Sequence, residues 1–173
     1  ATTYSIIKRH EGHIAVTSSL GKGTSFTFYL PASATVAGSH DDISEGLLQG
    51  TGRILVMDDE EEIREVLGKM LQHLGFEVDF ACDGSQAVAL YCRAMEDKTP
   101  YVATILDLTI PGGMGGKETL RRIQQQHPDA IVIVSSGYSN DPVMAQATQF
   151  GFSGFIPKPY NLVDLSKVLS RLL

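Results

Sequence analysis

The spacing of hydrophobic and polar residues divides the chain into two patterned parts, separated by a stretch without periodicity. From Arg53 onward, short apolar runs of strand length alternate with segments whose apolar residues recur at helical spacing. The helical spacing is clearest between Glu60 and Leu74, and Gly75 then supplies a helix stop. Strands are predicted at Arg53–Met57, Phe76–Ala81, Tyr101–Leu106, Ile131–Val134 and Gly154–Ile156. Helices are predicted at Glu60–Leu74, Gly84–Met95, Lys117–Gln126, about Pro142–Phe150 and Asn161–Leu173.

This alternation predicts an α/β fold. Strands that are each followed by a helix imply right-handed crossovers, and hence a doubly wound five-stranded parallel sheet covered by helices on both faces. We expect the strand order 2-1-3-4-5, in which the first and third strands are neighbours.

The first part of the chain has a simpler pattern. A helix and two strands joined by a glycine turn are predicted there, at Thr3–His10, His13–Ser18 and Thr24–Leu30. This is too little chain to close a core by itself. The small and polar residues from Ala32 to Gly52 are typical of a linker, in which we expect Leu47 and Leu48 to dock locally. The expected division is an N-terminal segment, a linker and a main domain, at residues 1–31, 32–52 and 53–173.

Charge and composition narrow the class of function. The net charge is -6 at pH 7 without a long basic stretch, which disfavours binding to nucleic acid. No apolar run approaches the roughly 20 residues of a membrane-spanning helix, and the N-terminus lacks a signal-peptide pattern. Cys82 and Cys92 have neither metal-site nor disulfide spacing, as expected for thiols in a reducing cytoplasm. We therefore expect a cytoplasmic protein that contacts neither nucleic acid nor a membrane.

Polar residues with complementary chemistry follow four of the predicted strands. Asp58 and Asp59 follow the first strand, Asp107 the third, Ser136 the fourth and Lys158 the fifth. Because parallel strands end at one edge of the sheet, these groups should share one crevice. Carboxylates crowded together repel unless a cation neutralises them, and an all-oxygen site partly open to water suits Mg2+.

Acceptance of a phosphoryl group by Asp107 fits this set of residues. An ionised carboxylate attacks phosphorus in line without a general base, while Mg2+, Lys158 and Ser136 neutralise the charge of the incoming group. Each residue alone also has an ordinary explanation, since acids are favoured at helix starts and aspartates cap turns. The coincidence at four strand ends favours the functional interpretation.

Four stretches of the main domain carry a resemblance to a known family. ILVMDDEEEIR, ILDLTIPGGMGG, VIVSSGY and GFIPKPY resemble the response-regulator receiver domain, which has a flavodoxin-like fold, over about Arg53–Leu173. The resemblance implies that Asp107 is the phospho-acceptor and Asp59 a direct Mg2+ ligand. It also implies that Asp58 assists largely through water and that the Thr109 backbone carbonyl completes the metal site.

The same resemblance implies a switch. Ser136 would be the switch hydroxyl, Phe155 the switch aromatic and Lys158 the lysine beside the acceptor, followed by a cis bond to Pro159. Two departures from the family pattern stand away from the site: Ile110 replaces a usual methionine, and residues 96–100 lengthen a loop.

The N-terminal segment carries a second resemblance. GHIAVTSSLGKGTSFTFYLP resembles the last part of the ATP-binding domain of sensor histidine kinases. The boxes that hold magnesium and adenine in that family have no counterpart here, so we expect no useful ATP binding. The two resemblances together imply the C-terminal receiver of a hybrid sensor histidine kinase. Whether this parent protein is anchored in a membrane upstream is left open. The receiver's partner would be a histidine kinase or a histidine-phosphotransfer protein, and whether this chain is an enzyme stays open.

Three other functions remain open. A phosphatase of the haloacid-dehalogenase type also uses an aspartyl nucleophile, although Thr109 stands where it needs a second acid. A flavodoxin-like cofactor binder is disfavoured because the acidic Asp58–Glu62 turn would repel a cofactor phosphate. A non-phosphorylated pseudo-receiver would act only as an interaction module. Apolar strand residues such as Phe26, Phe28 and Leu30 also leave a homodimer open.

Overall fold

The computed structural model describes residues 2–32, 47–137 and 147–173. The chain divides into two units, Ala1–Asp41 and Asp42–Leu173.

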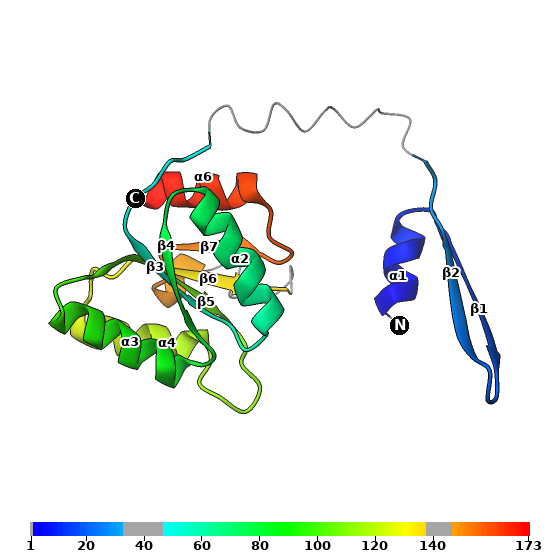
Figure 1. The fold of residues 1–173 in the computed structure, drawn as a ribbon, viewed down its shortest axis with the longest axis horizontal. Coiled ribbons are helices and arrows are strands. Elements are labelled where there is room, and N and C mark those ends of the chain that lie inside the picture. Colours follow the sequence, from blue (N-terminus) through cyan, green and yellow to red (C-terminus); the bar gives the residue numbers. More distant parts are fainter. Residues whose placement is uncertain (1, 33–46, 138–146) are drawn as a thin grey trace. The chain divides into compact units, whose positions relative to one another are not determined.

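The larger unit is built on a parallel sheet of five strands in the order β4-β3-β5-β6-β7 (Figure 1). This order confirms the predicted doubly wound α/β fold. The strands are β3 (Arg53–Met57), β4 (Glu77–Ala81), β5 (Tyr101–Asp107), β6 (Val132–Ser136) and β7 (Gly154–Pro157). Because every pair is parallel, all five strands end at the same edge of the sheet.

Helices cover both faces of this sheet (Figure 1). They are α2 (Glu61–His73), α3 (Gly84–Glu96), α4 (Gly116–Gln126) and α6 (Leu162–Leu172), with a short 3-10 helix η2 (Ala147–Phe150). Side-chain caps start two of them: Asp83 accepts from the Gln86 amide and Asn161 from the Asp164 amide, both at 2.8 Å. Most of the helix predicted at about Pro142–Phe150 lies outside the described residues.

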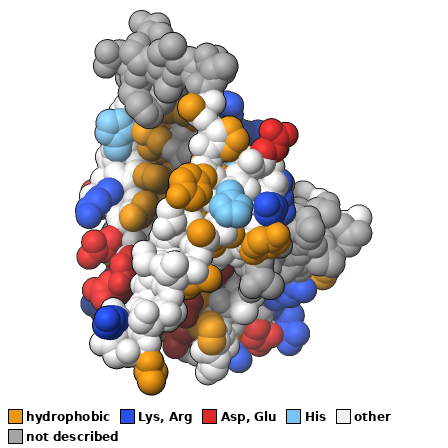
Figure 2. Space-filling view, turned by 90° about the vertical axis from the view of Figure 1, so that its right-hand side faces the viewer, with side chains coloured by type: hydrophobic (Ala, Val, Ile, Leu, Met, Phe, Trp, Pro, Cys, Tyr) orange, Lys and Arg blue, Asp and Glu red, His pale blue; other side chains and the backbone are white. Residues whose placement is uncertain are grey.

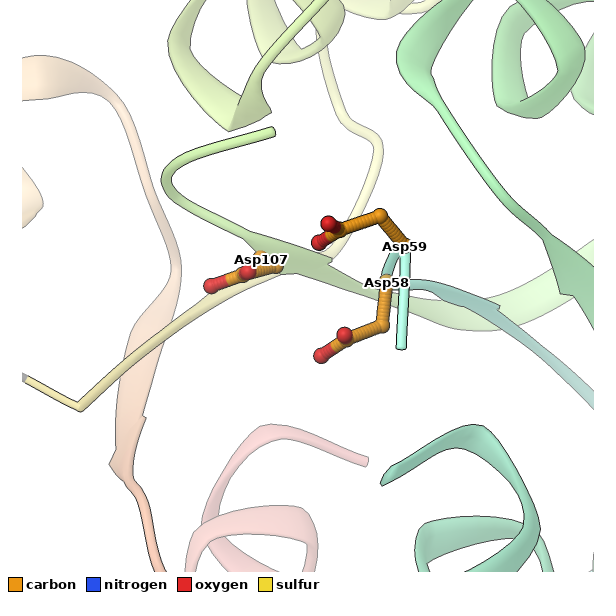
Figure 3. Close-up of side chains that lie close together, drawn as sticks. All are labelled: Asp58, Asp59 and Asp107. Atoms are coloured by element: carbon orange, nitrogen blue, oxygen red, sulfur yellow. The ribbon is translucent and has the colours of Figure 1, made fainter. Parts of the chain in front are cut away.

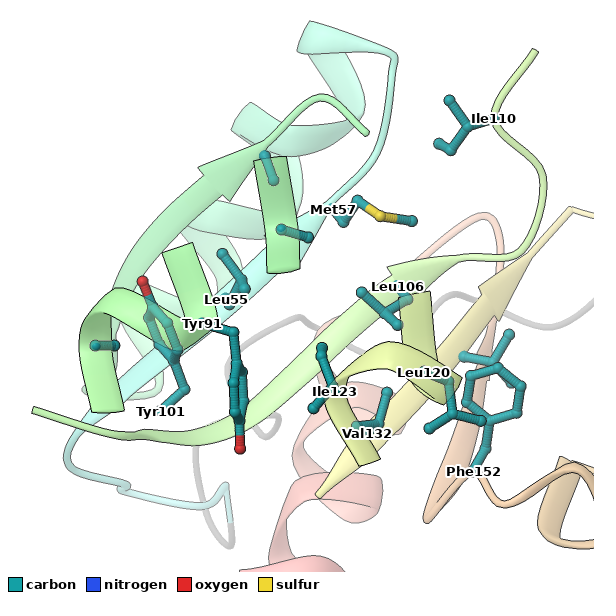
Figure 4. Packing of buried hydrophobic residues seen from close by; sticks show 14 of the residues in the cluster. Leu55, Met57, Tyr91, Tyr101, Leu106, Ile110, Leu120, Ile123, Val132 and Phe152 are labelled. Atoms are coloured by element: carbon teal, nitrogen blue, oxygen red, sulfur yellow. The ribbon is translucent and has the colours of Figure 1, made fainter. Parts of the chain in front are cut away.

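Strand alternation divides the core into two layers. In β3, Leu55 and Met57 point to the layer under α3 and α4, while Ile54 and Val56 point to the layer under α2 and α6. Figure 4 shows the first layer, in which Leu120 and Ile123 of α4 pack on β5 and β6 side chains. Burial on both faces explains why the strands appear in the sequence as continuous apolar runs.

Residues 47–52, here called the entry segment, belong to the larger unit and pack on its core. The Leu48 amide donates to Ser166 Oγ of α6 at 2.8 Å, and the Gly50 amide donates to the Leu74 carbonyl at 2.7 Å. Leu47 and Leu48 pack on the layer under α2 and α6. A Cβ atom on Gly50 would lie 1.9 Å from Phe76 Cζ, so only glycine fits there.

The smaller unit consists of helix α1 (Thr2–Arg9) and an antiparallel hairpin of β1 (His13–Ser19) and β2 (Gly23–Tyr29). Val16 lies opposite Phe26, and Ile14 lies opposite Phe28, so these side chains share one face. Val16, Phe26 and Phe28 are each at least half exposed, and Figure 2 shows hydrophobic side chains open to solvent on one face of the molecule.

Candidate functional site

The predicted site residues gather at the carboxyl edge of the sheet. Asp58 and Asp59 follow β3, Asp107 ends β5, Ser136 ends β6 and Lys158 follows β7. Met57 lies beside Leu106 in the pairing of β3 with β5, which brings the next residues of both strands together. The sheet geometry alone therefore assembles groups from distant parts of the sequence.

The loop after Asp107 folds closely over the end of β5. Gly112 has a φ of 71°, and the Gly113 amide closes a turn onto the Ile110 carbonyl at 3.2 Å. A Cβ atom on Gly116 would lie 2.7 Å from the Asp107 carbonyl oxygen, so glycine lets α4 begin directly against the site. Ile110, the departure from the family's methionine, is buried in the core.

Three carboxylates converge at this edge. Asp58, Asp59 and Asp107 each offer an oxygen, and these oxygens lie within 4.8 Å of one another. Figure 3 shows their carboxyl groups turned to the same side. Asp58 is 1% and Asp107 9% exposed, whereas Asp59 is open to solvent. The cluster is therefore buried at its base and open at one end.

A cavity of about 490 Å³ lies over this cluster. Its lining residues are Asp59, Glu60, Asp107, Thr109, Pro111, Ser136, Gly137 and Lys158. Every predicted site residue except Asp58 and Phe155 is among them. Asp58 lies beneath the cavity, and Phe155 is a 43% exposed residue of β7, paired with Val134 of β6.

Lys158 contacts both buried acids. Its Nζ lies 3.3 Å from Asp107 Oδ2, beside the acid as predicted, and 2.6 Å from Asp58 Oδ2, which is the closer partner. Burial lowers the pKa of Lys158, but the hydrogen bond to Asp58 and the nearby negative groups outweigh it and raise that pKa overall. The ammonium group therefore stays charged. The Lys158–Pro159 bond is cis, as the family resemblance implies.

The two buried carboxylates have different surroundings. Asp58 Oδ1 accepts from the Glu60 amide at 3.0 Å and Asp58 Oδ2 accepts from Lys158, so both of its oxygens already have donors. Burial raises the pKa of Asp107, and the positive charge of Lys158 only partly offsets this. Of these two buried acids, Asp107 is thus the one whose negative charge is less compensated.

These residues fit a divalent cation. The available donors are all oxygens, the acids carry more charge than Lys158 neutralises, and the site opens to water on one side. Mg2+ prefers such a site, with few carboxylates and several waters. The negative charge that Lys158 leaves unneutralised at this cluster gives a physical reason for a cation to bind.

Sequence reasoning missed one polar pair next to the site. The hydroxyls of Ser135 and Tyr160 are hydrogen-bonded at 2.6 Å. Burial is the main reason why the pKa of Tyr160 is raised to about 12. Both residues lie in the quoted motifs VIVSSGY and GFIPKPY, but nothing in the sequence indicates that they meet.

Comparison with known proteins identifies the family. The family model described as the response regulator receiver domain matches residues 54–170, and the chain belongs to this family. It is thus a receiver domain of two-component signalling, a class that binds Mg2+ at an acidic pocket and works with histidine kinases or phosphotransfer proteins.

The most informative relatives are long sensor proteins. The chain is 30% identical to the sensor kinase CckA of Brucella abortus, a match that covers 98% of this chain and 18% of CckA. It is 31% identical to the sensor histidine kinase AtsR of Burkholderia thailandensis, over 99% of this chain and 29% of AtsR. The chain therefore spans less than a third of either relative.

Solved structures agree with this assignment. The response regulator TrrA of Thermotoga maritima, in complex with Mg2+ and BeF, is 31% identical with a TM-score of 0.60, covering 70% of this chain and 99% of TrrA. The receiver domain of NtrX from Brucella abortus is 34% identical with a TM-score of 0.61, covering 69% of this chain and 97% of that domain. Within the described residues, no helix is both long and apolar enough to cross a membrane.

Proposed function

We propose that this chain is the receiver of a phosphorelay and that Asp107 is its phospho-acceptor. The observation that carries the proposal is the position of Asp107, buried at the base of an acidic cavity with Lys158 Nζ at 3.3 Å. A carboxylate needs no general base to attack phosphorus, so the residues around it serve to position and neutralise the incoming group.

Asp59, Asp107 and the Thr109 backbone carbonyl would hold Mg2+ directly, with Asp58 assisting through water. Because both Asp58 oxygens already accept protein hydrogen bonds, an indirect role suits this residue. The bound ion would neutralise phosphoryl oxygens and so reduce their repulsion by the acids.

The reaction transfers a phosphoryl group from a phosphohistidine to Asp107. One Asp107 oxygen forms a bond to phosphorus as the nitrogen–phosphorus bond of the donor breaks, and the donor imidazole leaves as a neutral ring after taking up a proton. Lys158 then exchanges part of its contact with Asp58 for a phosphoryl oxygen, and the Ser136 hydroxyl donates a hydrogen bond to the same group. The Lys158 ammonium and the Ser136 hydroxyl stabilise the product, because the negative phosphoryl oxygens on Asp107 would lie next to them.

The switch would follow from that hydrogen bond. As Ser136 is drawn toward the phosphoryl group, Phe155 turns from its exposed position into the space released beside β6. The surface around β7 changes shape as a result. This is the face that a histidine kinase or histidine-phosphotransfer partner would contact.

The parent protein would be a hybrid sensor histidine kinase, in the cytoplasm or anchored to a membrane upstream. Residues 1–31 would complete its ATP-binding domain, residues 32–52 would link the parts and residues 53–173 would form the receiver. The exposed apolar face of the β1–β2 hairpin supports this division, because a two-stranded hairpin is marginally stable alone and needs a covering layer. The relatives CckA and AtsR, described as sensor kinases, match this segment as well.

Intact-mass measurement tests the acceptor. With acetyl phosphate and Mg2+, the wild-type chain should gain one phosphate that hydroxylamine removes, as for an acyl phosphate. Asp107→Asn should gain none, whereas Asp129→Asn, which changes an exposed aspartate before β6, should label normally. Equal labelling of wild type and Asp107→Asn would refute the assignment. An unlabelled wild type would favour a pseudo-receiver, and continuous turnover of p-nitrophenyl phosphate a phosphatase.

A further inference from the structure

The hydrogen bond between Ser135 and Tyr160 joins two elements that carry site residues. Ser135 is fully buried in β6, and Tyr160 is half-buried in the segment between β7 and α6. Their oxygens are 2.6 Å apart. Two hydroxyls of this kind have few other partners in the apolar layer under α2 and α6, on which Tyr160 packs.

Backbone bonds connect the same two elements to the acceptor strand. The Leu108 amide, next to Asp107, donates to the Ser135 carbonyl at 2.9 Å. The Lys158 amide donates to the Ser136 carbonyl, also at 2.9 Å. The end of β6 therefore lies between the acceptor on one side and the lysine on the other.

The segment from Lys158 to Tyr160 is held to β6 at two points. The backbone bond to Ser136 holds its first residue, and the Ser135 hydroxyl holds its last. A single attachment would let the segment pivot, whereas two attachments fix its direction. That direction decides where the ammonium group of Lys158 lies between Asp58 and Asp107.

We propose that Tyr160 is a positioning residue for phosphoryl acceptance, which acts by holding Lys158 through its hydrogen bond to Ser135. The inference rests on the proposed role of Asp107. The tyrosine touches neither the phosphoryl group nor the carboxylates; it restricts the lysine that does. Since the pKa of Tyr160 is about 12, the phenol keeps its proton and the hydrogen bond persists at neutral pH.

A purely structural bond would behave differently from a positioning one. Removing both hydroxyls leaves no unpaired polar atom in the apolar layer, so the double variant Ser135→Ala/Tyr160→Phe should be nearly as stable as wild type. If the bond only supports folding, that variant should also accept phosphate at the wild-type rate. If it positions Lys158, the reaction stays slow although the fold is intact.

The experiment compares phosphorylation rates in a double-mutant cycle. Tyr160→Phe and Ser135→Ala should each lower the rate constant for phosphorylation by phosphoramidate about fivefold. The double variant should react no more slowly than the slower of the two single variants, because all three lack the same hydrogen bond. The Mg2+ dissociation constant, measured by calorimetry, should change less than about twofold, since no metal ligand is altered. Tyr91→Phe is the matched control, because Tyr91 is a buried tyrosine that contacts Tyr101 and His127 instead, and its rate should be unchanged.

The outcomes separate this inference from the proposed function. A wild-type chain that is not labelled, or an Asp107→Asn chain that is, overturns both. If wild type is labelled but the rate of Tyr160→Phe is unchanged, the positioning role alone is overturned. The same holds if the rate reduction in the double variant is the product of the two single reductions, or if the double variant regains the wild-type rate. Should Tyr160→Phe fail to fold, Ser135→Ala removes the same bond from the other side and decides.

Discussion

Replacing Asp107 by asparagine removes a buried negative charge from the site while preserving the size of the side chain. Asp107 is 9% exposed and belongs to a cluster with Asp58 and Asp59. In the variant, Lys158 keeps its 2.6 Å contact with Asp58, so its ammonium group is not left without a partner. The substitution therefore tests how much the folded protein is destabilised by keeping Asp107 ionised.

The magnitude depends on two opposing charge interactions and on burial. At an effective dielectric constant of about 20, the opposite charges of Lys158 and Asp107, 3.3 Å apart, attract by about 5 kcal/mol. Asp58 and Asp59 each offer an oxygen within 4.8 Å of an Asp107 oxygen, so each repels Asp107 by at least about 3.5 kcal/mol when ionised. The variant loses the one attraction and both repulsions, and the repulsions act in the same direction as burial. Because burial raises the pKa of Asp107 overall, we expect the variant to have the higher free energy of unfolding at neutral pH, by about 0.5–2 kcal/mol, the usual range for a stabilising substitution.

The pH dependence gives a second, independent test. With its pKa raised on folding, Asp107 binds a proton in the folded state at a pH where the unfolded chain has lost it. Wild-type stability from this group is therefore greatest below the ordinary aspartate pKa and falls as pH rises through the raised folded-state pKa. The asparagine variant has no such group and does not lose stability in this way. The difference in free energy of unfolding between the variant and wild type should therefore be absent in acid and reach its full size above the folded-state pKa of Asp107.

Urea unfolding followed by circular dichroism measures both quantities, since the sequence has no tryptophan for fluorescence. Asp59→Asn is the matched control: it removes a charge from the same cluster, but an exposed one, and should gain less. An unchanged or lower free energy of unfolding for Asp107→Asn at neutral pH would refute the reasoning. The same difference at acid and neutral pH would refute it equally.

Three further predictions concern stability. Thr104 is fully buried, and its Oγ1 has no hydrogen-bond partner among the described residues. Thr104→Val should therefore raise the free energy of unfolding by about 1 kcal/mol, which shifts the midpoint of urea unfolding to a higher concentration. Gly50→Ala places a Cβ atom 1.9 Å from Phe76 Cζ and should lower the free energy of unfolding by about 1–3 kcal/mol, whereas Gln49→Ala at the exposed neighbouring residue should change little. Mg2+ at about 100 times its dissociation constant should raise the free energy of unfolding of wild type by about 2.7 kcal/mol in the same assay. At that same Mg2+ concentration the increase should be smaller for Asp59→Asn. An equal increase would exclude Asp59 as a ligand.

The fold could be predicted because the alternation of apolar runs with segments of helical spacing can be recognised directly in the sequence. Strands buried on both faces appear as apolar runs, and the helices between them allow only parallel pairing in few orders. The convergence of Asp58, Asp107 and Lys158 follows from the same rule, since parallel strands end at one edge. Thr104 does not disturb the pattern, because a single β-branched hydroxyl inside an apolar run still favours a strand.

The remaining features depend on contacts that leave little trace in the sequence. The docking of Leu47 and Leu48 was predicted, but the partners of the Leu48 and Gly50 amides were not, because every sequence has such backbone amides. The closer contact of Lys158 with Asp58 is a matter of side-chain direction within one crevice. The hydrogen bond between Ser135 and Tyr160 joins residues 25 positions apart, and no spacing pattern in the sequence links these two positions.

The attachment of the entry segment has a consequence for exchanging receivers between signalling proteins. A gene fusion that starts at Arg53 would strip the Ser166 hydroxyl and the Leu74 carbonyl of their donors and uncover the apolar surface beneath Leu47 and Leu48. The splice point for transplanting this receiver therefore lies upstream of Leu47.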